Sequence, residues 1–371
     1  MIDTILCGDS IENMRKLEDE SVDLIFADPP YWMRTSGTLE RVEGTEFNGC
    51  DDEWDKFTSL EEYENFTKEW LSECRRILKK NGSIWVIGGM QCIYTIGSIM
   101  TQLGFWIIND VIWYKTNPTP NFKGTRLCNS HETLIWATKE EKSRYTFNYK
   151  TAKEINHENV SDNDFKNGIR KQLGSIWRIP ICSGAERIKD ADGNKLHSTQ
   201  KPEELLYRII VISSNQNDIV FDPFGGTMTT GAVAKKLGRH YIMSEKNPVY
   251  CEYGRNRIDN IVPVIDDIAK ATYDIKPLRV KIPEMIVDGF LYENEPMFMD
   301  GVVGSVILLA NGKVLMQDGT VTDMHSAAAK MRNVKAKRVN GFDFWKVIRN
   351  DELVGIKEIR EKYREYRKKL F

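Results

Sequence analysis

Short, mainly apolar runs alternate with segments of helical spacing in this chain, and this alternation limits most strongly which folds it can adopt. Strand-length runs occupy residues 3–7, 22–27 and 83–87, and residues 59–79 repeat apolar side chains every three to four positions. Strands this apolar are typical of a sheet that is covered on both faces. Because parallel strands need helical crossovers, the pattern predicts a doubly wound α/β fold with a mostly parallel sheet.

The alternation continues to about residue 115 and returns after residue 200. We expect Ser10 to cap a helix that runs to about Leu17, and a last helix of this region to end near Ile261. Further helices are expected at 91–102, 203–213 and 229–237, and further strands at 105–114, 219–221 and 240–243. Between the two blocks, residues 117–130 are rich in Pro, Gly and Asn, and residues 139–195 are polar, charged and weakly periodic. We therefore expect an inserted region of loops and short elements at about 115–195.

A chain of 371 residues exceeds the size that one core usually supports, which predicts two domains. We place the first at 1–263, a linker at 264–277 and a small second domain at 278–371. Within the second domain, the apolar run 305–309 beside Asn311-Gly312 predicts a hairpin. The tail 357–371 is expected to be a basic helix.

Composition excludes several classes of protein. The formal net charge is −2, so binding to nucleic acid must depend on local basic patches. The chain starts without the basic and apolar segments of a signal peptide, and it has no apolar run of about 18 residues, so we expect no membrane span. Its seven cysteines are scattered without a Cys-x-x-Cys pair. We therefore expect a cytoplasmic protein without disulfides or a metal site.

The sharpest motif is Asp28-Pro29-Pro30-Tyr31, which directly follows the apolar run 22–27. The exocyclic amino nitrogen of a nucleobase is a poor nucleophile because its lone pair is delocalised into the ring. A carboxylate and a rigidly held carbonyl that accept hydrogen bonds from this amino group would leave the lone pair available for attack. Tyr31 offers a flat face on which a base swung out of a duplex can stack. An ordinary strand-ending turn is the competing interpretation.

The second motif is Asp222-Pro223-Phe224-Gly225-Gly226-Thr227, a strand end that opens into a glycine turn. Glu245 follows about 20 residues later at the next strand end, where a carboxylate can bind ribose hydroxyls. In an open α/β sheet, ligands bind beyond the carboxyl ends of central strands. Neighbouring strands that end at Asp28 and Asp222 would therefore bring a group donor and its acceptor face to face.

These motifs, in this order, resemble those of the β-class DNA amino-methyltransferases. The resemblance covers about the whole chain and is strongest to the cell-cycle-regulated and Hinf-type GANTC adenine methylases. The segments that carry it are VDLIFADPPY (22–31), DDEWDKF (51–57), GSIWVIG (82–88), NPTPNFKGTR (117–126), HETLIWATK (131–139), ERIKDADG (186–193), HSTQKPEELLYR (197–208), DPFGGTMTTGAVAKKLGR (222–239) and GFDFWKV (341–347).

The resemblance implies a Rossmann-like methyltransferase that uses S-adenosyl-L-methionine to methylate N6 of adenine in double-stranded DNA, with base flipping. It also implies a possible homodimer. Asp28, Pro29, Pro30 and Tyr31 would form the target-base pocket. The cofactor residues would be Asp9, His197, Ser198, Thr199, Lys201, Asp222, Phe224, Gly226, Thr229, Thr230 and Glu245. The inserted region would recognise the target sequence.

Candidate DNA contacts lie in two basic segments. In the inserted region, Asn117, Asn121, Lys123 and Arg126 could reach phosphates or base edges. Residues 330–338 carry five basic and no acidic side chains, among them Lys335, Lys337 and Arg338. Such a run favours a phosphate-facing patch in the second domain, although a solvated basic surface would look the same.

The cofactor loop departs from the family pattern at two places. Gly225 and Met228 stand where the family has a bulky residue and its second glycine, and Met243-Ser244-Glu245 replaces Gly-Ile-Glu. If Met228 crowds the cofactor, the chain could be a non-catalytic DNA-binding subunit. A second alternative is an N4-cytosine methyltransferase on the same fold, although Asp28 favours adenine because cytosine enzymes often carry Ser there.

Overall fold

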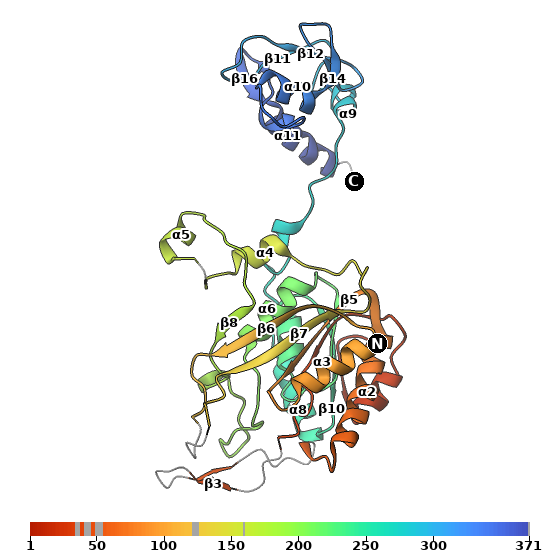
Figure 1. Cartoon of the computed structure of the whole chain (residues 1–371), viewed down its shortest axis with the longest axis vertical. Coiled ribbons are helices and arrows are strands. Elements are labelled where there is room, and N and C mark those ends of the chain that lie inside the picture. Colours follow the sequence, from red (N-terminus) through yellow and green to blue (C-terminus); the bar gives the residue numbers. More distant parts are fainter. Residues whose placement is uncertain (34–37, 41–45, 49–54, 121–125, 159, 370–371) are drawn as a thin grey trace. The chain divides into compact units, whose positions relative to one another are not determined.

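The computed structural model describes residues 1–33, 38–40, 46–48, 55–120, 126–158 and 160–369 (Figure 1). The chain divides into two compact units, Met1–Ile275 and Lys276–Phe371. Each unit has its own buried apolar core. We describe them separately.

The first unit is built on an eight-stranded sheet with the order β1-β10-β9-β2-β5-β7-β6-β8. The five strands from β1 to β5 in this order run parallel, and β7 is antiparallel to both of its neighbours. This sheet confirms the expected mostly parallel α/β fold. The strands are β1 (Thr4–Cys7), β2 (Val22–Ala27), β5 (Leu78–Gly88), β6 (Trp106–Lys115), β7 (His131–Thr138), β8 (Ile176–Ile179), β9 (Ile219–Asp222) and β10 (His240–Glu245).

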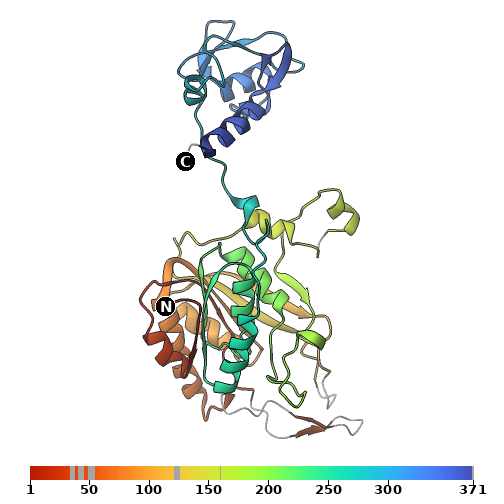
Figure 2. The same cartoon turned by 180° about the vertical axis from the view of Figure 1, so that it is seen from behind.

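Helices cover both faces of this sheet (Figures 1 and 2). One face packs mainly against α1 (Ser10–Arg15), α2 (Leu60–Ile77) and α3 (Ile93–Gln102). The other packs against α6 (Glu203–Ser213), α7 (Thr229–Lys236) and α8 (Pro248–Asp259). These helices agree with the expected ranges to within a few residues. The two layers bury the apolar runs of the central strands, as the sequence pattern predicts.

The inserted region contributes to the sheet and also forms short elements beside it. Its strand β8 pairs with β6, and Trp177 of β8 is buried close to Trp85 of β5. The remaining elements are α4 (Tyr149–Glu154), α5 (Asp162–Lys166) and the 3-10 turn η2 (Gly184–Glu186), while a separate hairpin pairs β3 (Thr38–Glu40) with β4 (Glu46–Asn48).

The start of α1 differs from the sequence expectation in its capping residue. Asp9, not Ser10, is the N-cap, and its Oδ1 accepts from the backbone N–H groups of Ile11 and Glu12 at 2.9 and 3.1 Å. An aspartate in extended backbone satisfies the first turn as well as a serine does, so the cap lies one residue earlier than expected.

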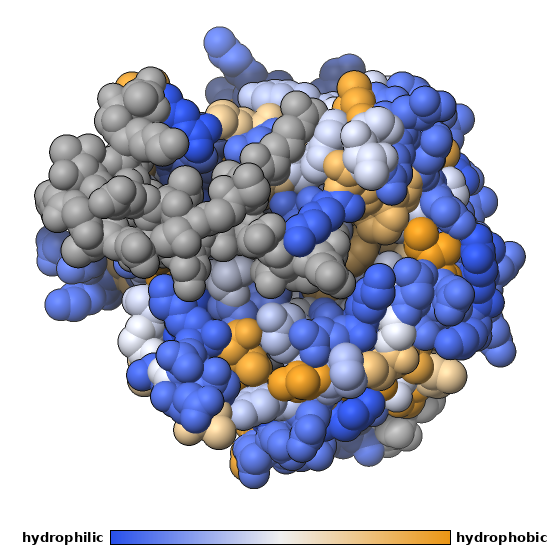
Figure 3. Space-filling view, turned by 90° about the horizontal axis from the view of Figure 1, so that it is seen from below, coloured by the Kyte–Doolittle hydropathy of each residue, from blue (hydrophilic) through white to orange (hydrophobic). Residues whose placement is uncertain are grey.

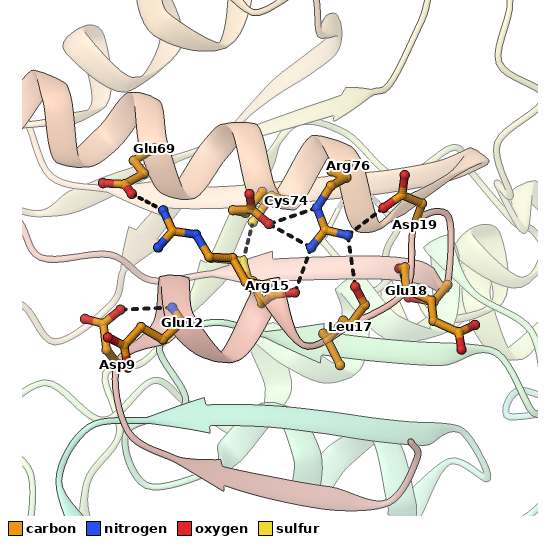
Figure 4. A network of polar contacts seen from close by, with 12 residues as sticks. Asp9, Glu12, Arg15, Leu17, Glu18, Asp19, Glu69, Cys74 and Arg76 are labelled. Carbon is orange, nitrogen blue, oxygen red and sulfur yellow. Dashed lines mark hydrogen bonds and ion pairs between the residues drawn. The ribbon is translucent and has the colours of Figure 1, made fainter.

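Arg76 of α2 ties the end of α1 to the rest of the unit (Figure 4). Its guanidinium donates to the carbonyls of Met14 and Leu17 at 2.8 and 2.9 Å and also pairs with Glu73 and Asp19. The Met14 carbonyl lies in the last turn of α1 and the Leu17 carbonyl lies just beyond it, so this side chain supplies donors that the helix itself cannot provide.

Most of the expected linker packs on the first unit. Ala269 and Ala271 are buried, and the Ala269 carbonyl accepts a hydrogen bond from buried Arg239. Asp274, in the 3-10 turn η3 (Thr272–Asp274), accepts from the backbone N–H groups of Lys150 and Thr151 at 2.8 Å each. The boundary between the compact units therefore falls at Ile275 and Lys276, inside the segment expected to be a linker.

The second unit is a small α+β fold whose core surrounds Trp345, Met297 and Tyr363. The hairpin expected around Asn311-Gly312 is present as β12 and β13, and the basic tail forms α11. The elements are α9 (Ile282–Val287), β11 (Pro296–Met297), β12 (Val306–Leu308), β13 (Lys313–Leu315), β14 (Val321–Asp323), α10 (Met324–Met331), η4 (Gly341–Asp343), β15 (Lys346–Arg349), β16 (Glu352–Gly355) and α11 (Ile356–Lys369).

Two general properties follow from the described part of the chain. None of its helices is long and apolar enough to cross a membrane. Its His, Cys, Asp and Glu side chains form no group of three or more that could hold a metal ion.

Candidate active site

The two acidic motifs meet because their strands are neighbours. β2 and β9 pair in parallel, with Leu24 opposite Val220 and Ile25 opposite Phe221. Both strands therefore end at the same edge of the sheet, and Asp28 and Asp222 line one cavity of about 1130 Å³. A cavity of this size has room for more than one drug-sized ligand. Seen from below Figure 1, apolar surface is exposed in a hollow among mainly hydrophilic side chains (Figure 3).

The Asp28 carboxylate is held by two side chains. Lys201 Nζ lies 2.7 Å from Asp28 Oδ2, and the Tyr31 hydroxyl lies 3.0 Å from Asp28 Oδ1. Lys201 is almost fully buried, with 9% of its side chain exposed. Lys201, which we expected among the cofactor residues, lies against the Asp-Pro-Pro-Tyr motif. The segment 197–202 therefore contributes to both halves of the cavity.

A second carboxylate, Glu132 of β7, completes this cluster. Its Oε2 lies 2.9 Å from the Tyr31 hydroxyl and 3.8 Å from Lys201 Nζ, and its Oε1 pairs with Lys115 Nζ at 2.6 Å. Neither Glu132 nor Lys115 was among the expected site residues. The signal available was the segment HETLIWATK, which begins one residue before Glu132.

Burial and charge act against each other in this cluster. Burial raises the pKa of Asp28, and the charge of Lys201 only partly opposes that rise. Burial alone would lower the pKa of Lys201, but Asp28 and Glu132 outweigh it and raise that pKa. Burial, with the charges of Asp28 and Glu132, raises the pKa of Tyr31 well above its usual value. Tyr31 is therefore a hydroxyl donor and Lys201 a cation at neutral pH.

The Pro-Pro turn is fixed by hydrogen bonds from α2 and from Asp55. The Tyr63 hydroxyl of α2 donates to the Pro30 carbonyl at 3.0 Å. The Asp55 carboxylate accepts from the backbone N–H groups of Trp32 and Met33 at 2.6 and 2.7 Å. Trp32 has a φ of +53°, which non-glycine residues rarely adopt, so these hydrogen bonds stabilise a strained turn. Asp55 and Tyr63 were not among the expected site residues.

The glycine turn holds the second half of the cavity. Asp222 is buried, and its carboxylate accepts from the Phe224 N–H at 2.9 Å and from the Thr230 hydroxyl at 2.6 Å. Burial raises the pKa of Asp222 to about 7. Glu245 accepts from the Gly226 N–H at 2.8 Å, and Gly226 has a φ of +52°. Phe224, Gly226, Thr229, Thr230 and Glu245 all line the cavity, as expected.

Met228 lies outside this lining. It adopts a left-handed backbone with a φ of 60°, and its side chain is fully buried against α8, where a Cβ on Gly254 would lie 2.2 Å from Met228 Cγ. The expectation that Met228 crowds the cofactor is therefore wrong, because its side chain points into the core. The second departure from the family pattern, Ser244, also has a structural role, because its hydroxyl accepts a hydrogen bond from Asn13 Nδ2 of α1 at 2.9 Å.

The segment 197–202 lies across the glycine turn. A Cβ on Gly226 would lie 3.6 Å from His197 Nε2, and His197, Ser198 and Thr199 line the cavity. Arg187 donates to the carbonyls of His197 and Ser198 at 3.1 and 3.3 Å. This arginine belongs to the segment ERIKDADG and was not among the expected site residues.

The remaining expected residues are spread more widely. Asp9 and Arg126 line the cavity. Asn117 is exposed, and its side-chain oxygen accepts from the Ile181 N–H at 2.8 Å. Asn121 and Lys123 lie outside the described residues. In the second unit, Lys335, Lys337 and Arg338 are exposed on the loop after α10, and Arg338 pairs with Asp323 at 3.1 Å.

An open α/β sheet whose Asp-Pro-Pro-Tyr turn and glycine turn share one cavity defines the class of this protein as an α/β methyltransferase. A family model described as DNA methylase, which covers both N6 and N4 methyltransferases, matches residues 22–256. The chain belongs to this family. It is a DNA methyltransferase, and S-adenosyl-L-methionine is its methyl donor.

Individual relatives support the same identification. The chain is 47% identical over 362 residues to the Type II methyltransferase M.HinfI of Haemophilus influenzae, which covers 98% of this chain and 97% of the relative. This confirms the expected Hinf-type resemblance. It is 38% identical over 253 residues to M2.LlaDCHI of Lactococcus lactis subsp. cremoris, covering 68% of this chain and 87% of the relative.

A solved structure supports the fold. The PvuII DNA methyltransferase, which is cytosine-N4-specific, aligns with a TM-score of 0.51 at 20% identity, covering 74% of this chain and 91% of that one.

Proposed function

We propose that this enzyme methylates N6 of adenine at GANTC-type sites in double-stranded DNA, after the target base has swung out of the duplex. The observation that carries the proposal is the meeting of Asp28 and Asp222 in one cavity, at the ends of two paired parallel strands. The 47% identity to M.HinfI supports the Hinf-type assignment, and the aspartate at position 28 favours adenine over cytosine.

The acceptor half of the cavity would activate the base. The Asp28 carboxylate would accept a hydrogen bond from the adenine amino group, and the Pro29 carbonyl a second one, because the Pro30 carbonyl already accepts from Tyr63. Both bonds would favour a tetrahedral nitrogen whose lone pair is available to the methyl donor, and the Asp28 carboxylate would accept the proton that N6 loses on methylation. Tyr31 would stack on the flipped base.

The other half would bind the methyl donor. S-adenosyl-L-methionine supplies an electrophilic methyl group. Glu245 would accept from its ribose hydroxyls, and Asp9 would lie near its adenine. The glycine turn fits a close ligand, because Gly226 carries no side chain and has a positive φ. The other residues proposed for this half are His197, Ser198, Thr199, Asp222, Phe224, Thr229 and Thr230.

The chain as a whole carries no excess positive charge, so DNA binding would depend on local groups of basic and polar side chains. We propose such groups in each unit. In the inserted region we propose Asn117, Asn121, Lys123 and Arg126, of which Arg126 lines the cavity. In the second unit we propose Lys335, Lys337 and Arg338, which would contact phosphates. Because the substrate is DNA, we also propose that the enzyme works in the cytoplasm.

We further propose a homodimer. Trp106 and Tyr114 of β6 and Ile176 of β8 expose 49%, 43% and 58% of their surface at one edge of the sheet. Exposed large apolar side chains on neighbouring strands at a sheet edge favour association with a second copy of the chain. Sedimentation of the wild type and of a Trp106→Lys, Ile176→Lys variant tests this. A wild type that stays monomeric at micromolar concentration contradicts the proposal.

The decisive experiment is expression in a host that lacks DNA methylation, followed by sequencing of modified bases. We expect N6-methyladenine at one short site in the wild type. Asp28→Ala should lower the methylation rate by about two to three orders of magnitude. Binding of S-adenosyl-L-methionine, measured by calorimetry, should change little. Residual activity above about a tenth of wild type contradicts the role of Asp28, and N4-methylcytosine contradicts the choice of base.

A further inference from the structure

Tyr31 has one hydroxyl proton and two carboxylates that can accept it. Its oxygen lies 3.0 Å from Asp28 Oδ1 and 2.9 Å from Glu132 Oε2, so both are within hydrogen-bond distance. A phenol donates one hydrogen bond at a time. Tyr31 can therefore donate its hydrogen bond to Asp28 or to Glu132, but not to both at once.

Both oxygens of Asp28 already accept a hydrogen bond before any base arrives. Its Oδ2 pairs with Lys201 and its Oδ1 faces the Tyr31 hydroxyl. A base amino group that donates to Oδ1 would share that oxygen with the Tyr31 hydroxyl, and two donors on one oxygen weaken each other. Glu132 sits on the far side of that proton, on β7, and is itself fixed through its other oxygen by Lys115 at 2.6 Å.

We propose that Glu132 is a positioning residue that takes the Tyr31 hydroxyl and so releases Asp28 to the target amino group. This inference rests on the proposed function, in which Asp28 receives the base. While the base is bound, Tyr31 donates to Glu132 and its ring stays in place as a stacking face. When the base leaves, the hydroxyl can return to Asp28, and neither buried carboxylate loses all its partners.

The charges of the cluster support this role. Two carboxylates share a buried site with two ammonium groups, so the cluster is close to neutral and Glu132 can stay ionised. Burial would raise the pKa of Glu132, but the charges of Lys201 and Lys115 lower it. An ionised carboxylate is a stronger acceptor for a phenol than a neutral amide or a water molecule.

Glu132→Gln tests the proposal with almost no change in shape. We expect the carbonyl oxygen of the introduced glutamine to stay on the Lys115 ammonium, so that its NH₂ group faces the Tyr31 oxygen. Tyr31 must then donate to Asp28 and compete with the base. Loss of one charge-assisted hydrogen bond of this kind should lower the single-turnover methylation rate by about ten- to a hundredfold. The affinity for S-adenosyl-L-methionine should stay within about twofold.

Tyr31→Phe separates this mechanism from a structural role, because it removes the competing proton and keeps the ring. If Glu132 acts through the Tyr31 hydroxyl, Glu132→Gln should lower the rate much less in the Tyr31→Phe background than in the wild-type background, since effects that run through one shared contact are not additive. Any effect of the altered charge beside Lys115 operates in both backgrounds and cancels in this cycle. Equal losses in both backgrounds overturn the proposal.

The matched control is Glu73→Gln, which removes a carboxylate from the Arg76 cluster away from the cavity. It should leave the rate per folded molecule unchanged. All variants are compared on a duplex that carries the site mapped for the wild type. A wild type that methylates no adenine refutes the proposed function itself. A wild type that methylates adenine, an inactive Asp28→Ala and a Glu132→Gln as active as Glu73→Gln refute only the role of Glu132.

Discussion

Replacement of Met228 tests how the cofactor loop of this chain departs from its family. The side chain is fully buried, and a Cβ on Gly254 would lie 2.2 Å from Met228 Cγ, so the two helices α7 and α8 meet through this methionine. The residue also has a φ of 60° and a ψ of 33°, a left-handed conformation that glycine adopts without strain. Removing the side chain therefore has two opposing effects on stability.

The two effects can be separated with two variants. Met228→Ala loses the buried side chain but keeps the strained backbone, and large-to-small core changes of this type cost about 2 to 5 kcal/mol. Met228→Gly loses the same contacts but relieves the left-handed strain, which is worth about 1 kcal/mol. We therefore expect both variants to be less stable than wild type, with the alanine variant less stable than the glycine variant by about 1 kcal/mol.

Urea unfolding followed by tryptophan fluorescence is a suitable assay, because eight of the nine tryptophans lie in the first unit and only Trp345 lies in the second. Calorimetry of S-adenosyl-L-methionine binding is the companion measurement. Because Met228 does not line the cavity, the dissociation constant of the folded glycine variant should stay within about threefold of wild type. A glycine variant that is more stable than wild type, or that binds the donor tenfold more tightly, refutes this reasoning.

Three further perturbations have defined outcomes. Burial raises the pKa of Asp222 to about 7, so the folded state binds more protons than the unfolded state above pH 4, and stability should fall as the pH rises from about 4 to 7. Asp222→Asn should remove that slope, as urea midpoints measured at several pH values will show. Arg76→Met should cost about 2 kcal/mol, because its guanidinium binds two carbonyls at the end of α1. Arg15→Met should cost less than about 1 kcal/mol, because its pair with Glu69 is exposed, and equal losses contradict this ranking. Truncation after Ile275 should leave a folded unit that binds the methyl donor but binds duplex DNA weakly, with a shallower dependence on salt. An unchanged affinity and an unchanged salt dependence contradict a DNA-binding role for the second unit.

The linear pattern of the chain determined the class of fold and the main features of the cavity. Mainly apolar runs such as 22–27 favour burial on both faces, so the parallel core of the sheet could be predicted from them. Asp28 and Asp222 each follow such a run directly, and strand ends of a parallel sheet share one edge. For this reason, the meeting of the two motifs could be predicted without coordinates.

Only the tertiary structure decided which other side chains complete the site. Glu132 stands at the start of an antiparallel strand, and Lys201 precedes a helix more than 60 residues later, so no periodicity connects them to Asp28. The direction of the Met228 side chain was equally hidden, because a left-handed turn can point a residue into a ligand or into the core. Sequence spacing specifies which elements are neighbours, but the position of a side chain within a cavity depends on packing between elements that are distant in the chain. The ion cluster around Tyr31 exists because β2, β7 and the segment before α6 converge at one edge of the sheet.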